Sequence, residues 1–302
     1  MLKPGSLVAR PLHTTDLTAV RRILETSAFT YARFTDAELP SLLGSRPAIG
    51  AFTVPNNPLS IMLNTSSLQA FLVTGSLVAP CAWLGGFGVT ETESQRFTDY
   101  LDLLLPALER ALYERGARTL YYSGSDLDAD WLRPILEARG FDLVTTLRSY
   151  DKDDYAIPAW GDTTLEVRPF ARADLPGVVA VENAAFADLW RYDAAGFIEV
   201  ERTYPYFVVA EDEQGIAGYQ FSAVDDRIGY LVRIAAHPRA ERRGVGTRLL
   251  AEAVYYFERQ RTRRIVLNTE DRNTRAHRLY ERFGFHQVYP RGFVLGRPIA
   301  AS

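Results

Sequence analysis

ERRGVGTRLL, residues 241–250, places two arginines and two glycines directly before a run of apolar residues at helical spacing. The first amides of a helix have no partners inside it, and they lie at the positive end of the helix dipole. Gly244 and Gly246 lack the Cβ atoms that would hold an anion away from those amides, and Arg242 and Arg243 can reach its outer oxygens. The stretch therefore predicts a turn that binds a diphosphate. The alternative is an ordinary tight turn with solvated arginines.

Two other phosphate motifs do not fit this turn. A nucleoside triphosphate P-loop continues with Lys and then Ser or Thr after its last glycine, whereas Thr247 and Arg248 stand here. A dinucleotide-binding fingerprint needs a third small residue, and Leu249 occupies that position. Both motifs are therefore excluded.

The pattern around the turn predicts the fold of the second half. Three β-rich runs, separated by short polar turns, precede it at 204–212, 216–224 and 228–237. Apolar residues recur at helical spacing after Gly246 and again around Tyr280, on either side of the buried run RIVLNT. The order strand, helix, three strands, helix, strand, helix, strand predicts an α+β half with one mixed sheet.

The segment NTRAHRLYERFGF, residues 273–285, predicts a helix that begins near Asn273 and ends at Gly284, because glycine favours the left-handed conformation that ends many helices. Together with IAAHPRAERRGVGTRLL, residues 234–250, it resembles the two cofactor motifs of the GCN5-related N-acetyltransferase (GNAT) family. The first stretch is similar to the family's Asn-to-Tyr-to-Gly-Phe motif, and the second to its acetyl-CoA pyrophosphate motif. The resemblance covers residues 164–290 and implies an acetyl-CoA-dependent N-acetyltransferase, in which an amine attacks the thioester directly.

The resemblance also implies which residues hold the cofactor. The backbone of the strand ending at 236 would bind the pantetheine arm and the acetyl carbonyl, and the amides of the turn would hold the diphosphate. Asn273 would contact the cofactor, with a simple helix N-cap as its alternative role. The family has Gln or Arg where Glu241 stands, but two arginines follow directly. The expected cofactor-binding residues are Ile234, Ala235, Ala236, Arg242, Arg243, Gly244, Val245, Gly246, Thr247 and Asn273.

Catalysis needs a proton for the leaving thiolate and a base for the amine. Tyr280 resembles the family's general acid, and core packing is its alternative role. Some members carry a Glu five residues before the Asn, where this chain has Asn268, so Glu270 becomes the candidate base, with a solvated loop carboxylate as the alternative. Making a lysine amine neutral at pH 7 costs about 4.6 kcal/mol, against about 1.4 kcal/mol for an α-amine. The absent Glu therefore favours a small or low-pKa acceptor amine, either a small molecule or a peptide N-terminus.

Two further side chains are weaker candidates. His237, at the end of the cofactor strand, is placed to relay a proton, and Glu182 lies on the first helix of the second half, where acceptor-site residues often gather in the family. Both are expected to be solvated surface residues instead.

The chain repeats its own pattern. LVARPLHTTDLTAV from Leu7 and LEVRPFARADLPGV from Leu165 share an Arg-Pro pair and an Asp-Leu pair at the same spacing. Both predict a strand followed by a helix, with the Asp or a neighbouring Thr as its cap. LEARGFDLV at 136–144 and YERFGFHQV at 280–288 also match, and the repeated pattern indicates a duplication.

The first half lacks both cofactor motifs. Glu91 and Glu93 stand at the corresponding helix start, where carboxylates repel a diphosphate, and Leu136 stands where the second half has Tyr280. We expect a degenerate GNAT-like domain at 1–150, a polar linker at 151–163 and a catalytic GNAT domain at 164–302. Each domain is expected to be α+β, with a mixed, mainly antiparallel sheet flanked by helices.

Composition limits the other possibilities. The 302 residues suit two domains of ordinary size, and a net charge of −3 gives no general attraction to nucleic acid or to anionic membranes. Cys81 is the only cysteine, which excludes an intramolecular disulfide and a Cys-rich metal site, so no metal is expected. No secretory h-region or membrane-spanning run is recognisable, which favours a cytoplasmic protein.

Two alternative functions stay open. The missing base permits a catalytically silent acyl-CoA-binding sensor or scaffold, although the retained Tyr280 argues against it. A tandem chain with one degenerate half also resembles mycothiol synthase, a small-molecule acetyltransferase.

Overall fold

The computed structural model of the chain describes residues 7–53, 67–90 and 96–300. The chain forms two compact units. The N-terminal unit comprises 1–123, 131–143 and 295–302, and the C-terminal unit comprises 124–130 and 144–294. This division differs from the expected boundary at 151–163, because strands β7 (Asp142–Lys152) and β13 (His286–Pro298) each run from one unit into the other.

The N-terminal unit is a sheet with helices on both faces. Its strands lie in the order β1-β3-β4-β5-β6, and the last residues of β13 follow beside β6. Helices α1 and α2 pack on one face and α4 on the other. The strands are β1 (Leu7–Pro11), β2 (Thr30–Ala32), β3 (Ala48–Thr53), β4 (Leu68–Val78), β5 (Cys81–Val89) and β6 (Thr119–Gly124). The helices are α1 (Leu17–Thr26), α2 (Leu39–Ser45), α4 (Phe97–Glu114) and α5 (Arg133–Glu137). Glu91 and Glu93, expected at the start of α4, lie outside the described residues.

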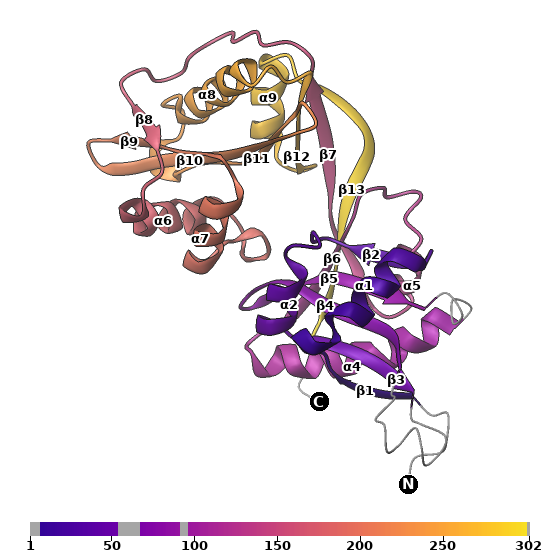
Figure 1. The fold of residues 1–302 in the computed structure, drawn as a ribbon. Coiled ribbons are helices and arrows are strands. Elements are labelled where there is room, and N and C mark those ends of the chain that lie inside the picture. Colours follow the sequence, from indigo (N-terminus) through magenta and orange to yellow (C-terminus); the bar gives the residue numbers. More distant parts are fainter. Residues whose placement is uncertain (1–6, 54–66, 91–95, 301–302) are drawn as a thin grey trace. The chain divides into compact units, whose positions relative to one another are not determined.

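The C-terminal unit has its sheet in the order β13-β7-β12-β11-β10-β9-β8, with α6 and α7 on one face and α8 and α9 on the other (Figure 1). From β7 to β8, neighbouring strands are antiparallel except β11 and β12, which are parallel. The α+β class and the two GNAT-like sheets are therefore as expected. The strands are β8 (Glu166–Pro169), β9 (Tyr206–Asp212), β10 (Gly215–Asp225), β11 (Ile228–Ala236) and β12 (Arg264–Glu270). The helices are α6 (Leu175–Ala185), α7 (Ala194–Thr203), α8 (Val245–Arg259) and α9 (Thr274–Arg282).

Helix α7 was not expected, because one helix was predicted between the first two strands of this half. It begins after Asp193, whose carboxylate accepts a hydrogen bond from the Gly196 amide at 2.7 Å. Asp is among the residues that best satisfy the free amides of a first turn. Phe197 and Val200 then bury one side of α7 against the sheet.

The alternation of strand β9 explains why both faces of the sheet are covered. Phe207 and Val209 pack toward α6 and α7, whereas Val208 and Ala210 pack toward α8. Successive residues of a strand point to opposite faces, so an uninterrupted apolar strand needs cover on both sides. Each fully buried Val or Phe side chain contributes about 1.5–3 kcal/mol to the free energy of folding.

The repeated sequence pattern corresponds to a repeated ion pair. Arg10 holds Asp16 through two hydrogen bonds of 3.0 and 2.8 Å, and Arg168 holds Asp174 through two of 2.7 and 2.8 Å. The expected capping role is corrected, because neither carboxylate caps the α-helix that follows. Each closes the short 3-10 turn before that helix, and Asp174 does so by accepting from the Ala171 amide at 2.8 Å.

Within the described ranges, no helix combines the length and the apolar composition needed to cross a membrane.

Candidate functional site

Strands β11 and β12 pair over three positions, Ile228–Tyr230 with Arg264–Val266, and then pair no further although both continue. The His237 amide donates to the Ala217 carbonyl on β10 at 2.8 Å. In an antiparallel pair the hydrogen-bonded positions alternate, so Ala235 also faces β10, whereas the backbone groups of Ile234 and Ala236 point away from it.

Across the described chain, β10 and β12 are the strands that pair with β11. Because β12 has stopped pairing by Ile234, the backbone of Ile234 and Ala236 forms an edge without a neighbouring strand, which we call the open edge of β11. A β-bulge lies next to it, since Phe221 is opposite Arg233 but Ser222 is opposite Leu231. A bulge bends a strand and re-aims its backbone.

The predicted anion-binding turn joins β11 to α8. Gly244 precedes the helix with φ of 83°, in the left-handed region, and the first bond inside the helix runs from the Arg248 amide to the Gly244 carbonyl at 2.9 Å. The amides of Val245, Gly246 and Thr247 therefore come before the first bond within α8 and lie at its positive end.

The structure gives Gly244 a reason besides the expected approach of an anion. A Cβ on Gly244 would lie 2.9 Å from the Asp162 amide nitrogen, and a Cβ on Gly246 would lie 3.6 Å from a Leu279 methyl carbon. Both missing Cβ atoms would therefore face other parts of the chain. Gly244 is required by its backbone conformation and by the close approach of Gly161 and Asp162.

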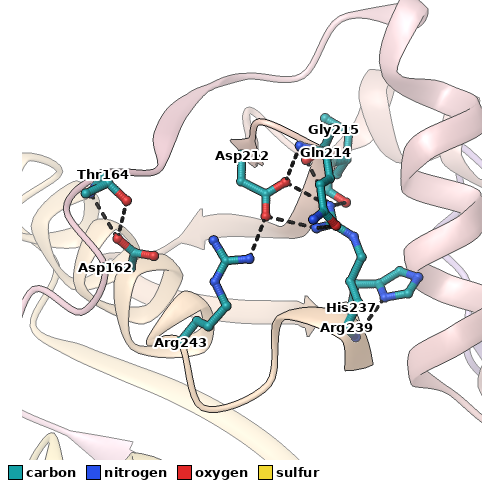
Figure 2. A network of polar contacts seen from close by, with 9 residues as sticks. Asp162, Thr164, Asp212, Gln214, Gly215, His237, Arg239 and Arg243 are labelled. Carbon is teal, nitrogen blue, oxygen red and sulfur yellow. Dashed lines mark hydrogen bonds and ion pairs between the residues drawn. The ribbon is translucent and has the colours of Figure 1, made fainter.

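One carboxylate connects the arginines of the turn with the β9–β10 hairpin. Asp212 accepts two hydrogen bonds from Arg239, at 2.9 and 3.0 Å, and one from Arg243 at 3.0 Å (Figure 2). The side chain of Asp212 is 8% exposed. The hydrogen bonds from Arg239 are the main cause that lowers the Asp212 pKa from 3.8 to about 2. Arg243 is thus partly engaged by Asp212 while 44% of its side chain is exposed.

This lowered pKa predicts a pH-dependent contribution to stability. A carboxylate with a lower pKa in the folded than in the unfolded state stabilises the fold above pH 4, and loses that effect as the pH falls toward 2. The advantage of the wild type over Asp212→Asn in the free energy of unfolding is expected to shrink by about 2 kcal/mol between pH 5 and pH 2. Urea unfolding of both proteins across this range measures it. An advantage that stays constant with pH would contradict the assignment.

Residues 153–164, which include most of the expected linker at 151–163, form a covering segment that packs against α8. The Tyr155 hydroxyl donates to the Thr262 carbonyl, and Ile157 packs against the cluster that includes α8 residues. The Trp160 ring lies 6.2 Å from the Tyr255 ring, centroid to centroid. The polar composition predicted a linker, but three apolar side chains within it provide surface that α8 can bury.

The covering segment ends against the turn before α8. Gly161 has a left-handed φ of 67°, and a Cβ there would lie 2.4 Å from the Gly244 carbonyl oxygen and 2.6 Å from the Arg248 amide nitrogen. Asp162 accepts from the Thr164 hydroxyl at 2.6 Å, and this bond is the main cause that lowers the Asp162 pKa, with smaller contributions from Arg243 and Arg248.

Gly161→Ala is therefore expected to destabilise the protein more than Gly215→Ala. Both positions have positive φ, which costs a residue with a Cβ about 1–2 kcal/mol, but a Cβ on Gly215 has no atom within 4 Å. The clash at Gly161 adds about 1–3 kcal/mol, because backbone atoms of the turn must move. Urea unfolding of the two variants gives the difference. Equal losses would mean that the covering segment does not contact the turn.

Helix α9 follows the prediction closely. Asn273 caps it by accepting from the Ala276 amide at 3.2 Å and also donates to the Thr269 hydroxyl at 3.2 Å. The helix ends at Arg282, and Gly284 has a left-handed φ of 82°. The capping alternative for Asn273 is thus realised, and its role toward a cofactor stays a prediction.

Tyr280 is 5% exposed and belongs to the apolar core between α8, α9 and the sheet. Its ring lies 5.9 Å from the rings of Tyr150 and Phe285. Ile234, at the open edge of β11, packs against the same cluster. Burial is the main cause that raises the Tyr280 pKa well above its usual value, so the phenol is protonated at neutral pH.

Comparison with known proteins identifies the family. A model of the acetyltransferase (GNAT) family matches residues 167–285. An uncharacterised N-acetyltransferase of Methanocaldococcus jannaschii is 31% identical over 121 residues, which are 39% of this chain and 76% of that protein. The chain belongs to the GNAT family. GNAT proteins use acetyl-CoA as a co-substrate.

Two other GNAT relatives are named by their acceptors. A mycothiol acetyltransferase of Mycolicibacterium gilvum is 27% identical over 202 residues, covering 60% of this chain and 65% of that protein. A putative ribosomal protein bS18-alanine N-acetyltransferase of Bacillus subtilis is 27% identical over 124 residues, covering 40% of this chain and 81% of that protein.

Solved structures share the tandem GNAT fold. A tandem GNAT protein from the clavulanic acid biosynthesis pathway aligns with a TM-score of 0.64 at 13% identity, over 98% of this chain and 100% of that chain. A GCN5-related N-acetyltransferase from Sphaerobacter thermophilus aligns with a TM-score of 0.62 at 14% identity, over 99% of this chain and 98% of that chain.

Sequence reasoning missed a buried pair next to Tyr280. The Tyr150 hydroxyl lies 2.8 Å from Nδ1 of His277, and Nε2 of His277 lies 3.0 Å from the Asp271 carbonyl oxygen. A carbonyl only accepts, so Nε2 of His277 donates to the Asp271 carbonyl. The spacing of three residues puts His277 and Tyr280 on one face of α9, which is a local signal for His277. Tyr150 comes from β7, 127 residues before His277, and has no such signal.

Glu270, the candidate base, lies in an ion pair. It ends β12 and forms an ion pair with Arg272 at 3.0 Å, with 19% of its side chain exposed. Asp271 pairs with Arg148, and Glu241 with Arg275. In the described part of the chain, no group of three or more His, Cys, Asp or Glu side chains is arranged to hold a metal.

His237 lies at the end of β11 in this GNAT unit. Its Nδ1 accepts a hydrogen bond from the Arg239 amide at 3.0 Å, which caps the short turn before α8 (Figure 2). The ring therefore has a local structural partner, and a relay role stays a prediction.

The expectation that Glu182 is solvated is wrong, because its side chain is fully buried. It accepts hydrogen bonds from the Tyr192 amide at 2.8 Å, from the Tyr219 hydroxyl and from Arg233 on β11. Arg233 also donates to the Trp190 carbonyl at 2.7 Å. The pair Glu182–Arg233 therefore ties the segment between α6 and α7 to the strand that carries the open edge.

Proposed function

We propose that the C-terminal unit binds acetyl-CoA and transfers its acetyl group to an amine that attacks the thioester directly. The observation that carries this proposal is the separation of β11 from β12 after Tyr230, which leaves the open edge of β11 beside the start of α8. Membership of the GNAT family supports the reaction class.

The residues fit an extended arm that ends in a diphosphate. An extended chain can pair with a free strand edge through backbone hydrogen bonds, and Ile234 and Ala236 offer such groups. A diphosphate suits the amides of Val245, Gly246 and Thr247, because they are unpaired within the helix and lie at its positive end. Exposed Arg242 and partly exposed Arg243 add positive charge at the same turn.

Tyr280 is the proposed general acid. The neutral amine nitrogen forms a bond with the acetyl carbon, the bond from carbon to sulfur breaks, and the Tyr280 proton passes to the sulfur. The nitrogen releases its extra proton to water, and Tyr280 regains a proton from water. The raised pKa keeps the donor protonated but makes a buried tyrosinate costly. Proton transfer is therefore expected to accompany sulfur departure rather than to precede it.

The proposed acceptor is an α-amine, on a small molecule or at a peptide N-terminus. Asn268 replaces the Glu that some GNAT members carry, and Glu270 forms an ion pair with Arg272, so neither of these two positions offers a strong base for a lysine amine. Deprotonation of an α-ammonium group at pH 7 costs only about 1.4 kcal/mol, so water can accept that proton. The two relatives that are named for mycothiol and for an N-terminal alanine of a ribosomal protein suit this class.

Release of free thiol from acetyl-CoA in the presence of single amines tests the function. Amino acids, peptide N-termini, cysteine-containing sugar amines and N-blocked lysine form the panel, and acetylated product is measured in parallel. We expect thiol release with at least one α-amine and little with N-blocked lysine. Binding of acetyl-CoA without turnover of any amine would favour the acyl-CoA sensor instead.

A further inference from the structure

The N-terminal unit repeats the strand separation that marks the proposed cofactor site. Strands β5 and β6 are parallel and pair over three positions, Cys81–Trp83 with Thr119–Tyr121, although β5 continues to Val89 and β6 to Gly124. This is the arrangement of β11 and β12, with the same number of paired positions. The N-terminal unit therefore retains the counterpart of the site, even though its sequence lacks the cofactor motifs.

A segment of the same unit occupies this counterpart. Strand β2 pairs antiparallel with Gly86–Gly88 of β5, with Tyr31 opposite Phe87. The other edge of Gly86–Gly88 already pairs with β4, so β2 lies on the edge that β6 has left. The Arg33 amide donates to the Gly85 carbonyl at 2.8 Å, and the alternation of antiparallel bonds makes Tyr31 and Phe87 the next hydrogen-bonded pair.

Side chains of this segment also contact strand β6. The Tyr31 hydroxyl donates to the Ser123 carbonyl at 3.1 Å, and Arg33 donates to the same carbonyl at 3.1 Å. The Tyr31 ring lies 4.8 Å, centroid to centroid, from the ring of Tyr122 on β6. Phe34 fills the space over Gly86, where a Cβ would lie 2.6 Å from its ring. The segment thus bridges β5 and β6 as an inserted strand would.

We infer that residues 30–34 act as a built-in occupant of the N-terminal counterpart of the proposed cofactor site, so that this unit accepts no acetyl-CoA and each chain holds one. The inference rests on the proposed function for its cofactor, because an extended pantetheine arm would need the backbone groups of β5 that β2 already uses. In the C-terminal unit the matching groups, on Ile234 and Ala236, remain available.

Residue-resolved amide hydrogen exchange, with and without acetyl-CoA, tests both parts separately. The Phe87 amide is expected to exchange at least about tenfold more slowly than an unpaired amide in the free protein, and to stay unchanged when acetyl-CoA is added. The Ile234 and Ala236 amides are expected to exchange fast and to slow with the cofactor. Calorimetry on the same samples should give one equivalent bound.

The outcomes separate the two proposals. Fast exchange at Phe87 in the free protein, slowing at Phe87 on addition of acetyl-CoA, or two equivalents bound would overturn the built-in occupant. If exchange at Ile234 and Ala236 does not change with acetyl-CoA and exchange at Phe87 is still slow, acetyl-CoA binding is rejected, but β2 remains the occupant of the N-terminal counterpart site. Tyr31→Phe removes one bond to Ser123 and should speed exchange at Phe87 several-fold, whereas the exposed Tyr289→Phe should not.

Discussion

Tyr280→Phe is expected to lower kcat about 10²- to 10⁴-fold while leaving the affinity for acetyl-CoA nearly unchanged, which is the range for loss of a positioned general acid. The phenyl ring keeps the contacts with Tyr150 and Phe285, so the free energy of unfolding should change little. Single-turnover thiol release and calorimetric titration of acetyl-CoA measure the two quantities.

Tyr150→Phe is the matched control for this variant. Tyr150 is a buried tyrosine in the same cluster, and its hydroxyl bonds to His277 at 2.8 Å. Its loss should cost about 1 kcal/mol of stability with a much smaller fall in kcat. A Tyr280→Phe variant that turns over within threefold of wild type would assign Tyr280 to core packing alone.

Glu182→Ala is expected to cost about 3–5 kcal/mol in the free energy of unfolding, because it leaves the Arg233 guanidinium without its counter-charge. Glu182 is 0% exposed and Arg233 is 12% exposed, so water cannot replace the lost partner easily. The segment between α6 and α7 also loses the bond from the Tyr192 amide. Urea unfolding at pH 7 measures the effect.

An exposed ion pair in the same unit supplies the control. Glu199 and Arg202 lie 3.6 Å apart and both are 65% exposed, so Glu199→Ala should change stability by less than about 1 kcal/mol. Adding Arg233→Met to Glu182→Ala should recover part of the loss, because it removes the uncompensated charge. A loss below 1 kcal/mol for Glu182→Ala would show that Arg233 is solvated.

Local signals account for what the sequence predicted of the fold. Glycine at 244 and 284, and Asn273 at a helix start, fix conformations within a few residues, and these positions lie where expected. The strand separation at Tyr230, the pairing of β7 with β12 and the insertion of β2 beside β5 depend on residues far apart in the chain. Short-range patterns contain no information on such pairings.

The candidate site divides in the same way. Arg242 to Gly244 form the turn before α8, and Val245 to Thr247 are the first residues of that helix, as the spacing of glycines and arginines predicts. Glu182 was expected in solvent because a single carboxylate on a helix usually is, and its partner Arg233 is 51 residues away. Asp212 likewise meets Arg239 and Arg243 only in the folded chain, 27 and 31 residues apart. Buried charge pairs of this kind become visible only when both partners are placed.

Calorimetric titration of acetyl-CoA into Gly244→Ala and Gly140→Ala tests the central claim, that the turn before α8 holds the cofactor. Both glycines have left-handed φ, of 83° and 80°, but a Cβ on Gly140 meets no atom within 4 Å, whereas one on Gly244 meets Asp162 and distorts the turn. We predict a dissociation constant raised at least about tenfold for Gly244→Ala, equivalent to about 1.4 kcal/mol, and a wild-type value for Gly140→Ala. Equal affinities in the two folded variants, or no binding to the wild type at millimolar acetyl-CoA, would contradict the account.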